Sequence, residues 1–153
     1  MAMKIAIGSD HAGFNLKENL RIWLLEQGHD VQDFGTHSDE RTDYPKYGQA
    51  VGLSVAHGES DFGVLVCGSG QGICMAANKV AGVRGGVIRD EQDALMTRAH
   101  NDANVACFGE RITTPSVAIE ALAMFLRTEF EGGRHETRVE QLGVIDSGDS
   151  LQS

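Results

Sequence analysis

The stretch Val64-Leu65-Val66-Cys67-Gly68-Ser69-Gly70-Gln71-Gly72-Ile73 joins an apolar run to a glycine-rich turn, with a cysteine at the junction. An apolar run of this length that ends in glycine predicts a β-strand buried on both faces. In an open parallel sheet, the last residue of such a strand lies at the carboxyl edge, where these folds hold ligands. The glycines that follow let backbone N–H groups approach an anion or an enolate oxygen. The stretch therefore predicts a nucleophile or base beside an oxyanion-binding turn.

Strand-like and helix-like segments alternate from this stretch to both ends of the chain. Strands are expected at residues 4–8, 31–34, 62–67, 83–88 and 105–108, and helices at 14–27, 44–57, 73–80, 90–101, 115–130 and 134–145. The spacing of apolar residues turns Leu95 and Val117 toward the core. Such alternation predicts a parallel sheet with helices on both faces. With right-handed crossovers, residues 1–153 form one α/β domain, a three-layer Rossmann-like sandwich with a five-stranded parallel sheet.

The composition is that of an ordinary soluble globule, with 41% hydrophobic and 23% charged residues. The chain has 13 basic and 22 acidic residues, which gives a net charge of −9. Nucleic acids and anionic membranes require a basic binding surface, so neither is an expected partner. A small anionic substrate is compatible with this charge, because a few local arginines suffice to bind it.

The cysteines and the first residues indicate a compartment. Three cysteines are an odd number for a disulfide framework, and without a CxxC pair they do not suggest a structural zinc site. The first strand begins at Lys4, which leaves no room for a signal peptide, and no apolar run is long enough to span a bilayer. We therefore expect a cytoplasmic protein.

Two polar segments offer further candidate site residues. Asp10 and His11 follow the first strand, which places them at the same edge of the sheet as Cys67. They also open a helix, whose N-terminal dipole favours an anionic group. The alternative is that Asp10 only caps the helix and His11 lies on the surface. His100 and Asn101 end a later helix, where polar residues often serve as caps.

The last helix carries two arginines on one face. Arg134 and Arg138 lie four residues apart, so their side chains point the same way. In an acidic protein, such a pair suits a phosphate monoester. A solvent-exposed helix face explains the spacing equally well.

Two other uses of the glycine turn fit poorly. A dinucleotide fingerprint follows the first strand, whereas this turn follows the third. A cysteine phosphatase needs an arginine soon after its thiolate, but the corresponding stretch ends in Gly72-Ile73-Cys74. Ser69 has no histidine nearby in the sequence and is therefore a poor hydrolase nucleophile.

Segments spread over nearly the whole chain resemble the ribose-5-phosphate isomerase B family, which is related to galactose-6-phosphate and allose-6-phosphate isomerases. The matching segments are GSDHAGF (8–14), ERTDYP (40–45), CGSGQG (67–72), AANK (76–79), HNDAN (100–104), FGER (108–111) and EGGRH (131–135). The resemblance implies an aldose–ketose isomerase that uses no metal and no other cofactor. It would interconvert ribose 5-phosphate and ribulose 5-phosphate through a cis-enediolate.

The resemblance also implies roles for individual residues. Cys67 is the base that moves a proton between C2 and C1 of the opened sugar, and His100 and Asp10 open the furanose ring. The enediolate is held by the turn, through Gly68, Ser69, Gly70 and Gly72. The phosphate is bound by His11, Arg134 and Arg138, with Arg111 as a further candidate, and the sugar hydroxyls by Tyr44 and Asn101.

Two departures from the family pattern and one topological inference refine this expectation. Some relatives use a glutamate a few residues after the cysteine position, but Ile73 occupies that place here, which favours Cys67 as the base. Ser69 stands where many relatives have threonine. His100 precedes the fifth strand and so belongs at the amino edge, opposite Cys67. We therefore expect a homodimer with shared active sites, whose dimers could pair into tetramers.

Other functions stay open at this point. The substrate could be allose 6-phosphate, galactose 6-phosphate or a tetrose phosphate. A non-catalytic protein that binds a sugar phosphate, or a nucleotide-binding module, could use the same fold.

Overall fold

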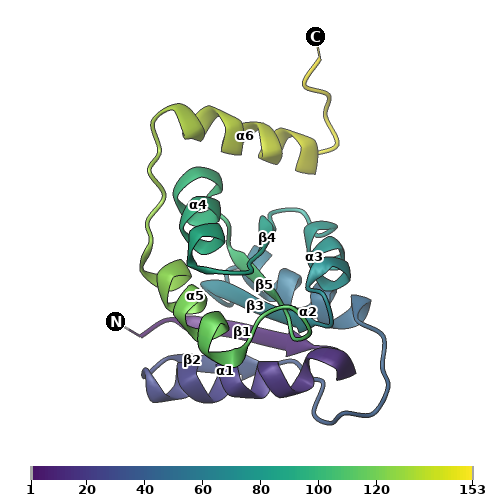
Figure 1. The fold of residues 1–153 in the computed structure, drawn as a ribbon. Helices are drawn as coiled ribbons and strands as arrows, with labels where there is room; N and C mark the ends of the chain where they lie inside the picture. The colour runs from purple at the N-terminus through teal and green to yellow at the C-terminus, as the bar shows by residue number, and fades with distance from the viewer. Residues whose placement is uncertain (1, 153) are drawn as a thin grey trace.

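A sheet of five parallel strands forms the centre of the computed structural model, which describes residues 2–152 (Figure 1). The strands are β1 (Lys4–Ser9), β2 (Asp30–Asp33), β3 (Phe62–Cys67), β4 (Gly85–Val87) and β5 (Val105–Gly109). They lie in the order β2-β1-β3-β5-β4. Nearly every residue of β1, β3 and β5 is buried, as expected for the central strands of a parallel sheet.

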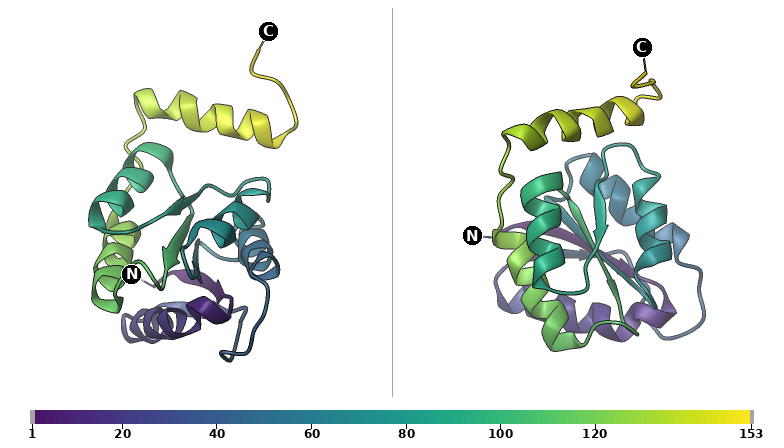
Figure 2. Two further views of the ribbon diagram at one scale, coloured as in Figure 1. Left: turned by 45° about the vertical axis from the view of Figure 1, so that its right-hand side comes forward. Right: turned by 45° about the horizontal axis from the view of Figure 1, so that its top comes forward.

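Helices cover both faces of the sheet, as two further views show (Figure 2). One face carries α1 (Phe14–Glu26), α4 (Glu91–Asn101) and α5 (Pro115–Arg127), and the other carries α2 (Pro45–Ala56) and α3 (Gln71–Asn78). A short 3₁₀ helix, η1 (His11–Gly13), precedes α1. Strand side chains alternate between the faces, so Val66 packs with the first set of helices and Cys67 with the second.

The last helix, α6 (Arg134–Asp146), stands outside these layers and lies across the amino edge of the sheet (Figure 1). The N–H of Glu131 donates to the carbonyl of Ala99 at 3.0 Å, which ties the start of α6 to the end of α4. At the other end, the Asp146 carboxylate accepts from the N–H of Gly82 at 2.8 Å. Most α6 side chains are exposed, so this helix adds little to the core.

Local sequence signals explain several helix boundaries. Asp90 caps α4 by accepting from the N–H of Asp93 at 2.9 Å. Thr114 caps α5, whose first residue is Pro115, a residue suited to that position. Gly28, with φ +87°, follows the end of α1.

The predicted three-layer α/β sandwich with a five-stranded parallel sheet is confirmed, with differences in detail. The third helix begins two residues earlier than predicted, because Gly70 adopts φ +80° and caps it. The fourth strand is limited to β4 at the edge of the sheet. Leu95 and Val117 are 37% and 36% exposed rather than inward, and both line a surface hollow between α4 and α5. Within residues 2–152, no helix is both long and apolar enough to cross a membrane.

Candidate active site

A pocket of about 460 Å³ opens at the carboxyl edge of the sheet, where β1, β3 and β5 end. The strand order reverses between β1 and β3, and such switch points are where open α/β sheets bind ligands. The residues that line the pocket are Asp10, His11, Ala12, Tyr44, Cys67, Gly68, Ser69, Gly72, Arg111 and Ile112. One chain thus brings together most of the residues that the sequence indicated.

Cys67 is the last residue of β3, and its side chain faces the turn that follows. The residue is 4% exposed, and its Sγ accepts a hydrogen bond from the N–H of Gly70 at 3.2 Å. This bond fixes the sulfur at the floor of the pocket. Gly70, a predicted binding residue, does not line the pocket, because its N–H donates to the sulfur rather than to a ligand.

The rest of the turn leaves backbone donors for a bound oxygen. The N–H of Gln71 donates to the Ser69 hydroxyl at 3.2 Å, and α3 begins at Gln71. The N–H groups of Gly72 and Ile73 lie in the first helical turn, where a helix offers no acceptor to its own donors. A Cβ at Gly72 would lie 2.7 Å from Cζ of Tyr44, so a side chain there would displace the Tyr44 ring. The Tyr44 ring therefore forms one wall beside the turn.

Asp10 and His11 reach the pocket from the end of β1. Oδ1 of Asp10 accepts from the N–H of Gly13 at 3.1 Å, so the capping interpretation of this residue holds. Its second oxygen accepts no hydrogen bond from residues 2–152. Nδ1 of His11 lies 3.1 Å from the backbone nitrogen of Thr42 and 3.0 Å from its carbonyl oxygen. Thr42 therefore positions the imidazole in either tautomer, and Nε2 forms no hydrogen bond with that residue.

Arg111 supplies a positive charge to the pocket. Its N–H donates to the carbonyl of Gly68 at 3.0 Å, and its guanidinium lies over the backbone of Gly68. Among residues 2–152, no carboxylate forms an ion pair with Arg111. An uncompensated guanidinium beside a small pocket suits a phosphate group.

The remaining predicted residues lie at the opposite edge of the sheet. His100 and Asn101 end α4, and Arg134 and Arg138 are exposed on α6. The sequence argument placed His100 at the amino edge, and the structure agrees. Within the described chain, these residues do not line the Cys67 pocket.

The end of α4 is held rigidly by Asp102, to which the sequence assigned no role in the site. Asp102 adopts φ +49°, and its carboxylate lies 2.8 Å from Nη1 of Arg98 and 3.4 Å from Nη2 of Arg84. Arg98 is buried and also donates to the carbonyl of Ala103 at 2.7 Å. Two arginines therefore fix the backbone that follows His100.

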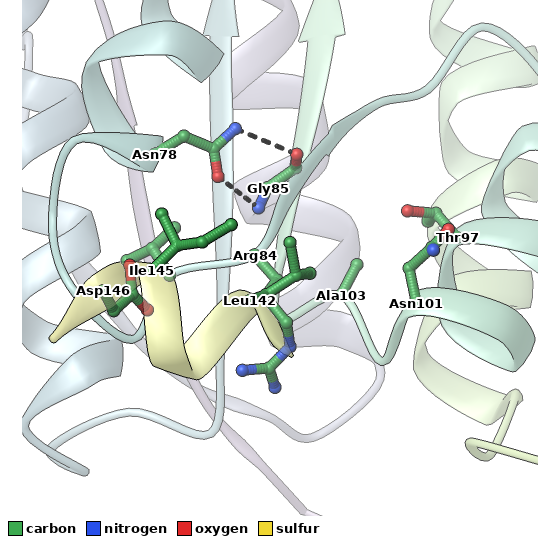
Figure 3. Close-up of a pocket in the computed structure, with 10 residues that line it drawn as sticks. Asn78, Arg84, Gly85, Thr97, Asn101, Ala103, Leu142, Ile145 and Asp146 are labelled. Atoms are coloured by element: carbon green, nitrogen blue, oxygen red, sulfur yellow. Dashed lines mark hydrogen bonds between the residues drawn. The ribbon is translucent and has the colours of Figure 1, made fainter. Parts of the chain in front are cut away.

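Asn101 opens onto a different cavity, of about 390 Å³, beneath α6 (Figure 3). Figure 3 shows Leu142 and Ile145 of α6 on one side of this cavity and Thr97 and Asn101 of α4 on the other. The cavity contains no cysteine or histidine in its lining. Its walls do not supply the chemistry of the Cys67 pocket.

Cys74 and Cys107 are packing residues, as predicted. Both are buried, and neither lines the Cys67 pocket. Burial raises the pKa of the Cys107 thiol well above its ordinary value. A hydrogen bond from Cys107 lowers the pKa of Cys74, and the Asn78 amide adds to that effect.

Comparison with known proteins identifies the family. Residues 5–142 match the family model described as Ribose/Galactose Isomerase. This chain belongs to that family. Ribose-5-phosphate isomerase B of Escherichia coli is 48% identical over 143 residues, which are 94% of this chain and 96% of that protein. The family match runs from β1 into α6, so it includes both groups of residues described above.

Solved structures of family members have the same fold. Ribose-5-phosphate isomerase B of Clostridium thermocellum gives a TM-score of 0.94 at 47% identity, over 97% of this chain and 100% of that one. The Mycoplasma genitalium ribose-5-phosphate isomerase B with bound ribulose-5-phosphate gives a TM-score of 0.91 at 37% identity, over 95% and 97% of the two chains. The predicted family resemblance is confirmed.

Proposed function

We propose that this protein is an aldose–ketose isomerase that interconverts ribose 5-phosphate and ribulose 5-phosphate through a cis-enediolate. The observation that carries this proposal is Cys67, buried at the floor of a pocket whose walls offer backbone N–H groups and an unpaired arginine. Family membership supports it, because similar proteins are ribose-5-phosphate isomerases B and one of them binds ribulose-5-phosphate.

Proton transfer between two carbons is the central step. The Cys67 thiolate removes the proton from C2 of the open aldose, and the same thiol returns it to C1 to give the ketose. A proton also moves from the C2 hydroxyl to the C1 oxygen, so atoms and charge balance. The N–H groups of Gly72 and Ile73, with the Ser69 hydroxyl, stabilise the negative oxygen of the intermediate.

Other residues open the ring and hold the substrate. Asp10 and His100 exchange protons with the ring oxygen and the anomeric hydroxyl of the furanose. The phosphate is bound by His11, Arg111, Arg134 and Arg138. Tyr44 and Asn101 contact the sugar hydroxyls, while Gly68 and Gly70 shape the turn.

The proposed active unit is a homodimer. One chain carries Cys67 and Asp10 at the carboxyl edge of its sheet and His100 at the amino edge. A second copy that presents its α4 and α6 to the Cys67 pocket supplies the missing groups. Two-fold symmetry then creates two equal sites. Pairing of dimers into tetramers, a single-domain organisation and a cytoplasmic location remain further predictions.

The direct test is an assay for ribulose 5-phosphate formed from ribose 5-phosphate, without added metal or cofactor. Allose 6-phosphate, galactose 6-phosphate and erythrulose 4-phosphate are tested in parallel, and kcat/KM should be highest for the pentose. No turnover of any sugar phosphate, together with thermal stabilisation by ribose 5-phosphate, would indicate a non-catalytic binding protein. Stabilisation by nucleotides alone would indicate a nucleotide-binding module.

A further inference from the structure

His100, Glu131 and His135 form a compact cluster where α4 ends and α6 begins. An imidazole nitrogen of each histidine and a carboxylate oxygen of Glu131 all lie within 4.8 Å of one another. The Glu131 oxygen is 3.7 Å from Nε2 of His135. The two imidazole rings stack, with centroids 4.4 Å apart and planes inclined by 15°.

His135 is buried, yet its ring has no hydrogen-bond partner within the part of the chain that the structure describes. Its side chain is only 9% exposed, and the Glu131 carboxylate lies beyond hydrogen-bonding distance. A buried imidazole without a hydrogen-bond partner leaves a nitrogen lone pair available to a ligand, and imidazole nitrogen is a common ligand of transition metals.

We propose that His100, Glu131 and His135 bind a divalent transition metal ion such as Zn²⁺, and that the bound ion inhibits the enzyme. Two imidazoles and one carboxylate are a known zinc ligand set that leaves the fourth position to water. Zinc bonds of about 2 Å place tetrahedral ligand atoms about 3.3 Å apart, so the three groups must approach by up to about 1.5 Å. Because the rings are nearly parallel, His100 must rotate out of the stack to share the ion.

The surrounding charges favour reversible binding of the metal ion over permanent binding as a cofactor. The C-terminal end of α4 and the Glu131 carboxylate attract a cation. Arg134 and Arg138, which also act on His135, oppose it. These opposing terms predict an affinity well below that of a closed structural site.

Metal binding would remove His100 from catalysis. The bound ion occupies the nitrogen that exchanges protons during ring opening, so turnover of the cyclic aldose stops. The inhibition, though not the binding, rests on the proposed function of His100. Binding and inhibition are therefore measured separately.

Binding is measured by Co²⁺ titration of the Cys67→Ala protein in phosphate-free buffer, followed by visible absorption. Removal of Cys67 eliminates the thiol that competes most directly for the ion. We expect the absorption of tetrahedral cobalt without a thiolate charge-transfer band, and its displacement by Zn²⁺. Absence of such absorption would overturn the proposal, whatever the outcome of the isomerase assay.

Two variants locate the ion. Glu131→Gln removes the carboxylate ligand at an exposed position, and His135→Phe removes a nitrogen while it keeps an aromatic ring against His100. Each should weaken cobalt binding by about 10-fold or more, because loss of even an outer-shell partner of a metal ligand typically costs about 10- to 100-fold in affinity. Unchanged binding in the folded Glu131→Gln protein contradicts the assignment even if His135→Phe does not fold.

Inhibition is measured with the protein that retains Cys67. Zn²⁺ should abolish turnover, and a chelator should restore it. Glu131→Gln should keep its basal activity but require about 10-fold more Zn²⁺ for the same inhibition. Equal sensitivity of Glu131→Gln and the unmodified protein would assign the inhibition to Cys67 and overturn the proposed inhibitory site.

Discussion

The two edges of the sheet carry two chemically different halves of the proposed active site. At the carboxyl edge, Cys67 and Asp10 are buried and held by backbone hydrogen bonds. At the amino edge, Arg134 and Arg138 are exposed on a helix that stands away from the core. The first half positions a reactive group, and the second offers charge to a molecule that arrives from outside. Neither half alone contains all the groups that the proposed mechanism needs, which are a base, a ring-opening histidine and a complete phosphate site.

The largest expected effect comes from removal of the base in the first half. Cys67→Ala should lower kcat for ribose 5-phosphate by about 10²- to 10⁴-fold, the usual contribution of a positioned proton-transfer group. Ribulose 5-phosphate formation measures the rate, and thermal stabilisation by substrate measures binding, which should persist. Cys74→Ala is the matched control, because its thiol is buried outside the pocket. Near-normal turnover by Cys67→Ala would remove Cys67 from the mechanism.

Mixing two inactive variants tests whether the two halves of the proposed site meet across a dimer. Cys67→Ala damages one half, and His100→Asn damages the other. In a shared-site dimer, one of the two sites in each mixed dimer keeps both residues, so unfolding and refolding an equal mixture should restore about a quarter of full activity. Each variant refolded alone is the control. If activity stays at the level of those controls, the two halves do not meet across a dimer.

A smaller effect is expected from one charge of the second half. Arg138→Met should raise KM for ribose 5-phosphate by about 10-fold or more, because a hydrogen bond between charged groups contributes about 1.5–3 kcal/mol. Arg89→Met is the matched control, since Arg89 is an exposed arginine paired with Asp93 outside both halves. An equal KM for the two variants would show that Arg138 does not bind the phosphate.

The sequence predicted the carboxyl-edge half well because strand ends determine it. Buried strands can be located from apolar runs, and parallel topology then collects Asp10 and Cys67 at one edge. The same logic placed His100 on the opposite side. It depends only on the order of strands and helices along the chain. Arg111 was a candidate only through the family resemblance.

The parts that escaped prediction depend on partners far apart in the sequence. Lys17 is fully buried, although lysine normally marks a surface, because Asp33 lies 2.7 Å from its Nζ. Asp102 requires Arg84 and Arg98 to hold its unusual backbone. His135 stacks on His100 across two helices, and no pattern within either helix indicates that contact.

The smallest expected effect is a difference between α6, at the amino edge, and α1, in the core layers, in their response to acid. Burial lowers the pKa of His135 below its ordinary value near 6.5, so the unfolded chain binds a proton more readily at this site. The contribution of the neutral ring to the free energy of unfolding is therefore lost as pH falls below about 6.5. In α1, Arg21 and Lys17 lower the pKa of Glu18 from 4.5 to about 2. That stabilising contribution is complete above 4.5 and is lost only as pH falls toward about 2.

Acid should therefore loosen α6 before it loosens α1. Amide hydrogen exchange, expressed as protection factors, should show α6 protection falling between about pH 7 and 5 while α1 protection stays constant. His135→Phe is the control, because a ring that cannot be protonated should remove the pH dependence of α6. Loss of protection in α1 at the higher pH, or an unchanged α6 response in His135→Phe, would contradict the assignment. The helix that loses protection first is determined by its ionisable group. A buried histidine contributes to the stability of α6, and an ion-paired carboxylate contributes to that of α1.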